Sequence, residues 1–196
     1  MEELVIRPVC DADAQRLAEI YSYYVEQTAV SFEYTAPSEE EFRKRIAFFS
    51  EKYPYLAAVR DGQIVGYAYA GPFHPREAYS RCCEMTVYLD RDARGQGIGR
   101  ALYEALEAQL REMGILNLYA LIAVPGHGDA YLTPASERFH TALGYQTAAR
   151  FHHCGYKVGQ WYDVIWMEKL IGEHGAAPQE LRRADGSPWE ETAEKS

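Results

Sequence analysis

The chain has 196 residues, of which 47% are hydrophobic and 25% are charged, and its formal net charge is −9. This length and composition indicate one folded domain with a packed core, and they exclude global disorder. The negative charge disfavours non-specific nucleic-acid binding, and the acidic start and short apolar runs indicate a cytoplasmic protein without a membrane partner.

The first part of the chain predicts one strand and two helices. A short apolar segment predicts a strand over residues 4–8. Apolar side chains at helical spacing then predict a helix that ends near Thr28. Ser38 and Glu41 form a capping box at the start of a second helix, which Pro54 ends.

Strands and a glycine-rich loop are predicted in the middle of the chain. Residues 55–60 and 63–70 flank Asp61-Gly62, which is a strong signal for a hairpin. A further strand is predicted over residues 82–89. The glycine-rich loop separates this strand from a helix predicted over residues 100–113.

The second half predicts a strand, a helix and a closing pair of strands. A strand over residues 117–124 leads into an irregular insertion over residues 125–134, and a helix follows over residues 135–143. Residues 145–154 and 161–170 predict an antiparallel pair. This order of elements predicts an α+β (mixed α/β) domain with a central, mostly antiparallel sheet flanked by helices.

The composition of the chain changes near residue 173. Gly, Ala, Pro and alternating charges dominate from there on, and apolar residues become sparse. Such a segment buries too little apolar surface to order itself. We therefore expect a domain over residues 1–172 and a flexible C-terminal tail over residues 173–196.

The cysteines and histidines show no metal-binding pattern. The four cysteines lack the spacing of metal ligands, and Cys82 and Cys83 are adjacent. The six histidines form no zinc pattern either. We therefore expect free thiols and no metal cofactor.

The loop Arg94-Gly95-Gln96-Gly97-Ile98-Gly99-Arg100 is the most informative motif of the chain. A glycine loop between a strand and a helix lets the backbone approach an anion and presents free N–H groups to it. It lacks the Gly-Lys-Ser/Thr ending of nucleotide-triphosphate loops, and the following strand lacks the acid that accompanies a dinucleotide loop. The alternative is a glycine-rich turn into a surface helix.

The pattern of Arg94, Gly97 and Gly99 resembles the pyrophosphate-binding loop of the GNAT superfamily of N-acetyltransferases, which hold acetyl-coenzyme A. The resemblance to its phosphinothricin acetyltransferase branch covers residues 4–170 and rests on residues 71–73, 78–79, 84–88, 136–140, 143–145 and 155–164. It implies the GNAT acyl-CoA N-acyltransferase fold. It also implies direct transfer of an acetyl group from acetyl-CoA to the α-amino group of a small acceptor such as phosphinothricin, methionine sulfone or methionine sulfoximine.

The resemblance implies three groups of cofactor contacts. The backbone of Val87, Tyr88 and Leu89 would pair with the pantetheine arm like an extra strand. The pyrophosphate would lie on Arg94, Gly95, Gln96, Gly97, Ile98, Gly99 and Arg100. Thr133 and Ser136 would contact the cofactor arm, although the relatives have a shorter loop here and an Asn where this chain has Thr133.

Glu84 is the candidate general base. Alternation along its strand puts Glu84, Thr86 and Tyr88 on one face. A carboxylate in an apolar strand is costly to bury unless it is paired or functional. The alternative to catalysis, direct or through a water, is an ion pair with Arg76 or Arg81.

His140 is the second catalytic candidate. It lies where many members of the superfamily have a Tyr near the cofactor sulfur, and a histidine can exchange a proton near neutral pH. It could therefore protonate the leaving thiolate, a task that a water could also perform. The alternative is a helix residue that packs beside Phe139.

The acceptor is expected to be a small-molecule amine with a carboxylate. Arg76 could bind that carboxylate through two hydrogen bonds, although a solvated loop charge is the alternative. The full set of acceptor-site candidates is Phe32, His74, Arg76, Tyr79, Glu84, Thr86 and Lys157.

Two other functions remain open at this point, and the resemblance also bears on the oligomeric state. The fold could serve as a non-catalytic acyl-CoA-binding regulatory domain, or as a peptide or protein N-terminal acetyltransferase with an open groove. The resemblance also implies a homodimer, for which the aromatic residues Tyr156, Trp161 and Tyr162 are interface candidates.

Overall fold

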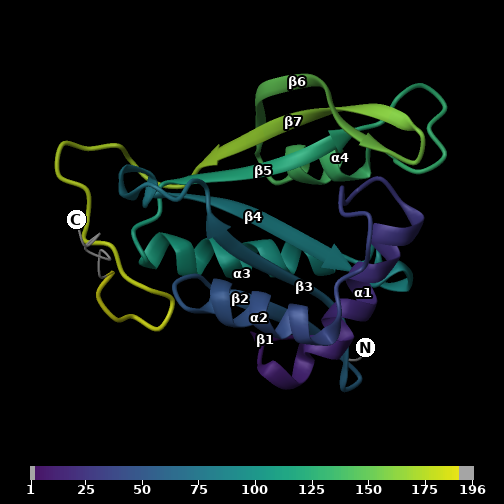
Figure 1. The fold of residues 1–196 in the computed structure, drawn as a ribbon. Helices are drawn as coiled ribbons and strands as arrows, with labels where there is room; N and C mark the ends of the chain where they lie inside the picture. The colour runs from purple at the N-terminus through teal and green to yellow at the C-terminus, as the bar shows by residue number, and fades with distance from the viewer. Residues whose placement is uncertain (1–2, 190–196) are drawn as a thin grey trace, which may run out of the picture.

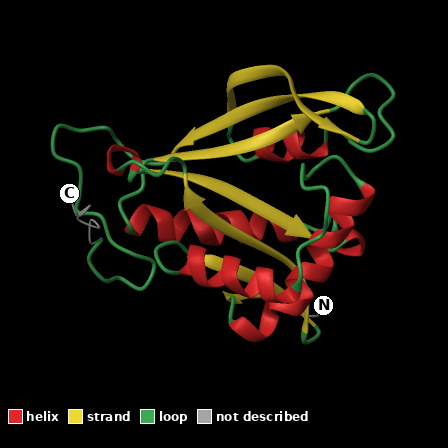
Figure 2. Ribbon diagram, in the orientation of Figure 1, coloured by secondary structure: helices red, strands yellow, loops and turns green. Residues whose placement is uncertain are grey.

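The computed structural model describes residues 3–189. Residues 190–196 of the expected tail lie outside the described residues. The expected order of elements is confirmed (Figures 1 and 2). The strands are β1 Val5–Pro8, β2 Tyr55–Arg60, β3 Gln63–Pro72, β4 Cys82–Leu89, β5 Asn117–Val124, β6 Gln146–Lys157 and β7 Gln160–Leu170, and the helices are α1 Ala14–Gln27, α2 Glu39–Ser50, α3 Ile98–Glu112 and α4 Ala135–Ala142.

The element boundaries follow local chemistry. The Ser38 side chain caps α2 by accepting a hydrogen bond from the Glu41 backbone N–H at 3.2 Å, which is one of the two bonds of the predicted capping box, while the Glu41 carboxylate accepts from the Arg45 guanidinium. Helix α3 starts at Ile98, two residues earlier than expected, because Gly97 adopts a left-handed conformation that lets the helix begin at once. Strand β6 continues past the expected residue 154 because irregular register between Phe151 and Gly155 absorbs extra residues.

Within residues 3–189, seven strands form one mixed sheet in the order β1-β2-β3-β4-β5-β7-β6. All neighbouring strands are antiparallel except β4 and β5, which run parallel. This pair is in register only over Cys82–Glu84. Beyond Glu84 the two strands part, and Figure 1 shows β4 and β5 diverging toward α1 and α4.

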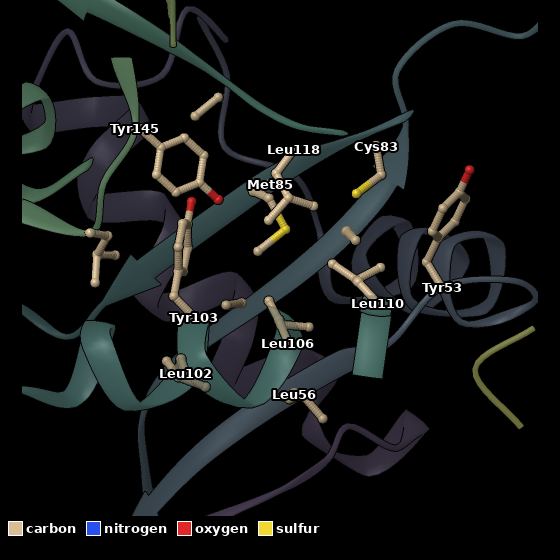
Figure 3. Close-up of a cluster of buried hydrophobic side chains, with 14 of the residues drawn as sticks. Tyr53, Leu56, Cys83, Met85, Leu102, Tyr103, Leu106, Leu110, Leu118 and Tyr145 are labelled. Carbon is tan, nitrogen blue, oxygen red and sulfur yellow. The ribbon is translucent and has the colours of Figure 1, made fainter. Parts of the chain in front are cut away.

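The two faces of the sheet carry different helices. On one face α1 and α2 pack against β2 and β3 through a cluster that includes Leu17, Phe42 and Tyr67. On the other face α3 buries its apolar stripe against the strands, and Figure 3 shows Leu102 and Leu106 within this cluster. Alternation along β4 divides its side chains between the two faces, as expected.

The segment after β7 lies against the domain as far as it is described. The backbone N–H of Arg182 donates to Met113 O at 3.0 Å, and that of Ala184 donates to Lys52 O at 3.0 Å. The ring of Trp189 lies 5.4 Å from that of Tyr53. The division of the chain at residue 173 stays a prediction.

None of the described helices combines the length and apolar character needed to cross a bilayer.

Candidate active site

A cavity of about 350 Å³ lies where β4 and β5 part. Both strands contribute side chains to it, as do the segment between α1 and α2 and the start of α4. Seven of the residues singled out from the sequence line this cavity together: Phe32, Glu84, Thr86, Val87, Tyr88, Ser136 and His140.

Glu84 forms no ion pair within the described part of the chain. Arg81, one of its possible partners, instead donates to Gly114 O at 3.1 Å. Burial raises the pKa of Glu84, because the carboxylate loses hydration without gaining a cation. An unpaired carboxylate with a raised pKa is suited to take a proton at neutral pH.

His140 is buried and neutral. Its Nδ1 lies 2.8 Å from Ser136 O, and since a carbonyl only accepts, Nδ1 carries the proton. Its Nε2 therefore accepts from the Tyr103 hydroxyl at 2.9 Å. Burial lowers the pKa of His140 to about 4. Both ring nitrogens are thus engaged inside the protein.

Two residues of β4, Val87 and Leu89, direct their peptide groups toward the edge that β5 leaves unpaired beyond Glu84, which we call the parted edge. The Asp90 N–H donates to Val65 O of β3, so by alternation Val87 and Leu89 direct their N–H and C=O groups away from β3 and toward the parted edge. The Tyr24 hydroxyl donates to Leu89 O at 2.6 Å and accepts from Leu89 N at 3.2 Å. The cofactor was expected to pair with Val87, Tyr88 and Leu89. Among these, Val87 has backbone groups that face the parted edge and form no hydrogen bond with the Tyr24 hydroxyl.

The glycine loop lies between the end of β4 and the start of α3. Gly95 and Gly97 have φ values of 73° and 79°, which L side chains rarely adopt. Gly97 caps α3, so the first N–H groups of that helix are directed out of the loop. The Arg94 guanidinium lies over the rings of Tyr23 and Tyr24 at 5.2 and 4.9 Å. The Arg100 guanidinium donates to Ala142 O at 3.2 Å.

Three acceptor-site candidates lie in a different place. His74, Arg76 and Tyr79 line a second cavity of about 340 Å³, together with Trp189 of the C-terminal segment. A single chain therefore does not bring these three side chains to the cavity that contains Glu84. Thr133 is exposed and does not line the first cavity.

Lys157 lies beneath the cavity wall rather than in the cavity. The residue is 4% exposed, and its ammonium donates to Val25 O at 2.7 Å and to Ser31 O at 2.5 Å. Burial lowers the pKa of Lys157. These hydrogen bonds connect strand β6 to the end of α1 and to the segment that carries Phe32 and Glu33.

Glu33 is a cavity residue that the sequence analysis did not identify. It accepts from both terminal nitrogens of Arg45 at 2.8 and 3.1 Å and from the Tyr21 hydroxyl at 2.8 Å. Burial alone would raise the pKa of Glu33, but these hydrogen bonds outweigh it and lower the pKa. No local pattern reveals this network, because its members come from α1, α2 and the segment between them. The other lining residues that were not singled out include Ser31, Tyr103 and Leu132.

Comparisons with known proteins find chains of similar sequence and fold. The family described as Acetyltransferase (GNAT) domain matches residues 6–166. A phosphinothricin N-acetyltransferase from Alcaligenes faecalis is 36% identical over 85% of this chain and 82% of its own. An L-methionine sulfoximine/L-methionine sulfone acetyltransferase from Pseudomonas paraeruginosa is 30% identical over 88% and 98%. A crystal structure of a phosphinothricin acetyltransferase from Sinorhizobium meliloti in complex with AcCoA has a TM-score of 0.81, with 34% identity over 90% of this chain and 94% of that one.

We predict that Lys157→Met loosens the segment over residues 28–33. Removal of the ammonium leaves two carbonyls without their donor, which costs about 1–3 kcal/mol for each buried group. The free energy of urea unfolding should fall, and amide hydrogen exchange over residues 28–33 should accelerate. Lys44→Met is the matched control, because the Lys44 side chain is 67% exposed. Equal exchange in both variants would contradict the assigned role of Lys157.

Proposed function

The chain belongs to the GNAT acetyltransferase family, and from this premise we propose that it transfers an acetyl group from acetyl-CoA directly to the α-amino group of a small amino acid or amino-acid analogue. The observation that carries this proposal is the unpaired Glu84 carboxylate in the cavity where β4 and β5 part. A non-catalytic acyl-CoA-binding domain would have no use for such a group.

The chain offers suitable groups for acetyl-CoA. The Val87 peptide group at the parted edge of β4 can pair with the amides of the pantetheine arm. Gly95 and Gly97 allow the backbone of the loop over residues 94–100 to approach a pyrophosphate at the N-terminus of α3. Ser136 lines the same cavity near the start of α4. Acetyl-CoA, when bound, supplies the activated acetyl thioester.

Gly97→Glu should weaken acetyl-CoA binding by at least about tenfold, or ~1.4 kcal/mol. The new side chain is strained at a φ of 79°, and its carboxylate occupies the anion site at the start of α3. Isothermal titration calorimetry with acetyl-CoA measures the change. Gly186→Glu is the control, since Gly186 has a similar φ of 82° and open space around it in the C-terminal segment. Equal affinity of the two variants would refute this placement of the pyrophosphate.

The reaction needs two proton transfers, one from the acceptor amine and one to the leaving thiolate. An acceptor amine is mostly ammonium at neutral pH, so it must lose a proton before it can react. Glu84 accepts that proton, because its raised pKa makes it a stronger base than an exposed carboxylate. His140 is neutral and has both nitrogens engaged, which supports a water as the proton donor to the leaving thiolate and a positioning role for His140 through Tyr103.

Glu84→Gln should reduce kcat by ~10²–10⁴-fold near pH 7 while leaving acetyl-CoA affinity unchanged. The activity of the unmodified enzyme should fall as the pH drops through the raised pKa of Glu84, because the protonated acid cannot act as a base. The deficit of the variant should shrink at high pH, where the free amine forms without help. Glu112→Gln, at an exposed position, is the control. Turnover of Glu84→Gln equal to that of the control would remove Glu84 from the mechanism.

The size of the cavity supports a small acceptor. Its volume of about 350 Å³ favours a compact molecule over a polymer or a protein N-terminus. The names of the relatives from Alcaligenes faecalis and Pseudomonas paraeruginosa point to amino-acid analogues. We therefore take an α-amino acid-like molecule as the acceptor.

Release of free thiol from acetyl-CoA should report this preference across a panel of amines. We expect kcat/KM for methionine sulfone to exceed the values for spermidine and kanamycin by at least about tenfold. A higher kcat/KM for either polyamine-like compound would overturn the proposed acceptor class, and the absence of turnover with every amine would favour a binding domain.

We further propose a homodimer in the cytoplasm. Tyr156 and Trp161 are 47% and 60% exposed on β6 and β7, whereas Tyr162 is 1% exposed and is too buried to serve an interface. A second copy could bring the Arg76 loop to the cavity that one chain leaves without it. The free cysteines suit a reducing compartment. A monomer in sedimentation at micromolar concentration would contradict the dimer.

A further inference from the structure

The described end of the chain folds into a short hairpin after β7. The backbone N–H of Arg183 donates to Ser187 O at 2.9 Å, and that of Trp189 donates to Leu181 O at 3.3 Å. The side chains of Leu181 and Trp189 pack against the core cluster that also contains the apolar stripe of α3. We use the name strap for residues 179–189.

The strap connects two turns that lie far apart in the sequence. The N–H of Arg182 donates to Met113 O at the end of α3, and the N–H of Ala184 donates to Lys52 O in the turn between α2 and β2. The Lys52 ammonium also lies 5.2 Å from the centre of the Trp189 ring. The strap therefore joins the ends of α2 and α3, which cover opposite faces of the sheet.

The strap also packs at the base of the loop over residues 73–81, which joins β3 to β4 and which we call the Arg76 loop. Arg81, the last residue of this loop, donates from its guanidinium to Gly114 O at 3.1 Å. The Glu180 carbonyl of the strap lies against Gly114, where a Cβ would be only 3.1 Å from it. Gly114 therefore contacts both the strap and the Arg76 loop.

Trp189 shares a cavity with the side chains of the Arg76 loop. It lines the second cavity together with His74, Arg76 and Tyr79. The Arg76 side chain forms no ion pair and no hydrogen bond within residues 3–189. The position of its guanidinium therefore depends on the packing of its loop and not on a charged partner.

The strap is remote from the groups assigned to acetyl-CoA. It meets α3 at the C-terminal end of that helix, whereas the glycine loop precedes the N-terminal end (Figure 1). The 15 residues of α3 separate these ends by about 22 Å. A change in the strap is thus expected to reach the Arg76 loop without moving the pyrophosphate site.

We propose that the strap is a positioning element for acceptor binding, in which Trp189 fixes the placement of the Arg76 loop. This inference rests on the proposed function, in which a second copy brings that loop to the cavity that contains Glu84. Arg76 forms two hydrogen bonds with an acceptor carboxylate only when its loop holds the guanidinium in one place. Loss of the strap contacts therefore weakens acceptor binding and leaves cofactor binding intact.

Trp189→Ala in the full-length chain should raise the KM for methionine sulfone by about 3–30-fold and leave the KM for acetyl-CoA within about twofold of the unmodified value. Trp189→Phe should restore most of the affinity, because it keeps an aromatic ring against Tyr53. Glu180→Gln is the matched control, since it lies in the strap with a side chain that is 75% exposed. An equal KM for methionine sulfone in Trp189→Ala and in the control would overturn the proposal.

Ala184→Pro breaks the strap at a second point, because proline has no N–H to donate to Lys52 O. It should raise the same KM, and it tests the strap independently of the indole ring. Amide hydrogen exchange over residues 73–81, measured without substrates, should be faster in Ala184→Pro and Trp189→Ala than in Glu180→Gln. A lowered Tm with an unchanged ratio of the two KM values would show a strap that only stabilises the fold, and would contradict the positioning role.

Arg76→Ala separates this inference from the function on which it rests. A raised KM for methionine sulfone in Arg76→Ala, with no increase in Trp189→Ala, would overturn the role of the strap alone. An unchanged KM in Arg76→Ala would remove the Arg76 loop from the acceptor site, and the strap proposal with it. Turnover of spermidine without turnover of methionine sulfone would overturn the proposed acceptor class, and hydrogen exchange over residues 73–81 would still decide whether the strap holds the loop.

Discussion

The limited pairing of β4 with β5 is the constraint on which the site depends. Strand β4 pairs with β3 along its length, but it shares only Cys82–Glu84 with β5. Buried peptide groups need partners, so a parted edge must be satisfied by something else. The Tyr24 hydroxyl forms hydrogen bonds with both peptide groups of Leu89, and the Val87 peptide group faces the parted edge. Glu84 stands at the last paired position, where the sheet still holds the backbone rigidly and the cavity begins.

The two carboxylates of the cavity have environments that shift their pKa values in opposite directions. Arg45 and Tyr21 hold Glu33 ionised by lowering its pKa, whereas burial without a partner raises the pKa of Glu84. Such a separation assigns different tasks to similar groups. Glu33 is held in a network with Arg45 and Tyr21, whereas Glu84 forms no ion pair with any of the described residues.

Some side chains that were predicted to contact the acceptor lie elsewhere in the structure. Lys157 was expected to contact the acceptor, but the structure buries its ammonium against Val25 O and Ser31 O. Arg76 precedes the strand of Glu84 by a few residues, yet it lines a separate cavity with Trp189. The insertion over residues 125–134 is irregular, as expected, and the Asp129 carboxylate fixes its backbone at Leu132. For Lys157 and Arg76 the deciding contacts come from residues far away in the sequence.

The sequence by itself determined the order of strands and helices, the alternation of β4 and the glycine loop before α3. These features depend on residues that are neighbours along the chain, so periodicity and dihedral preference suffice to predict them. Only the tertiary structure decided that Glu84 has no cation beside it among residues 3–189, that Glu33 has one, and that His140 has both nitrogens engaged. Those properties arise from contacts between separate elements, and burial and pairing, rather than residue type, set the charge state of a side chain.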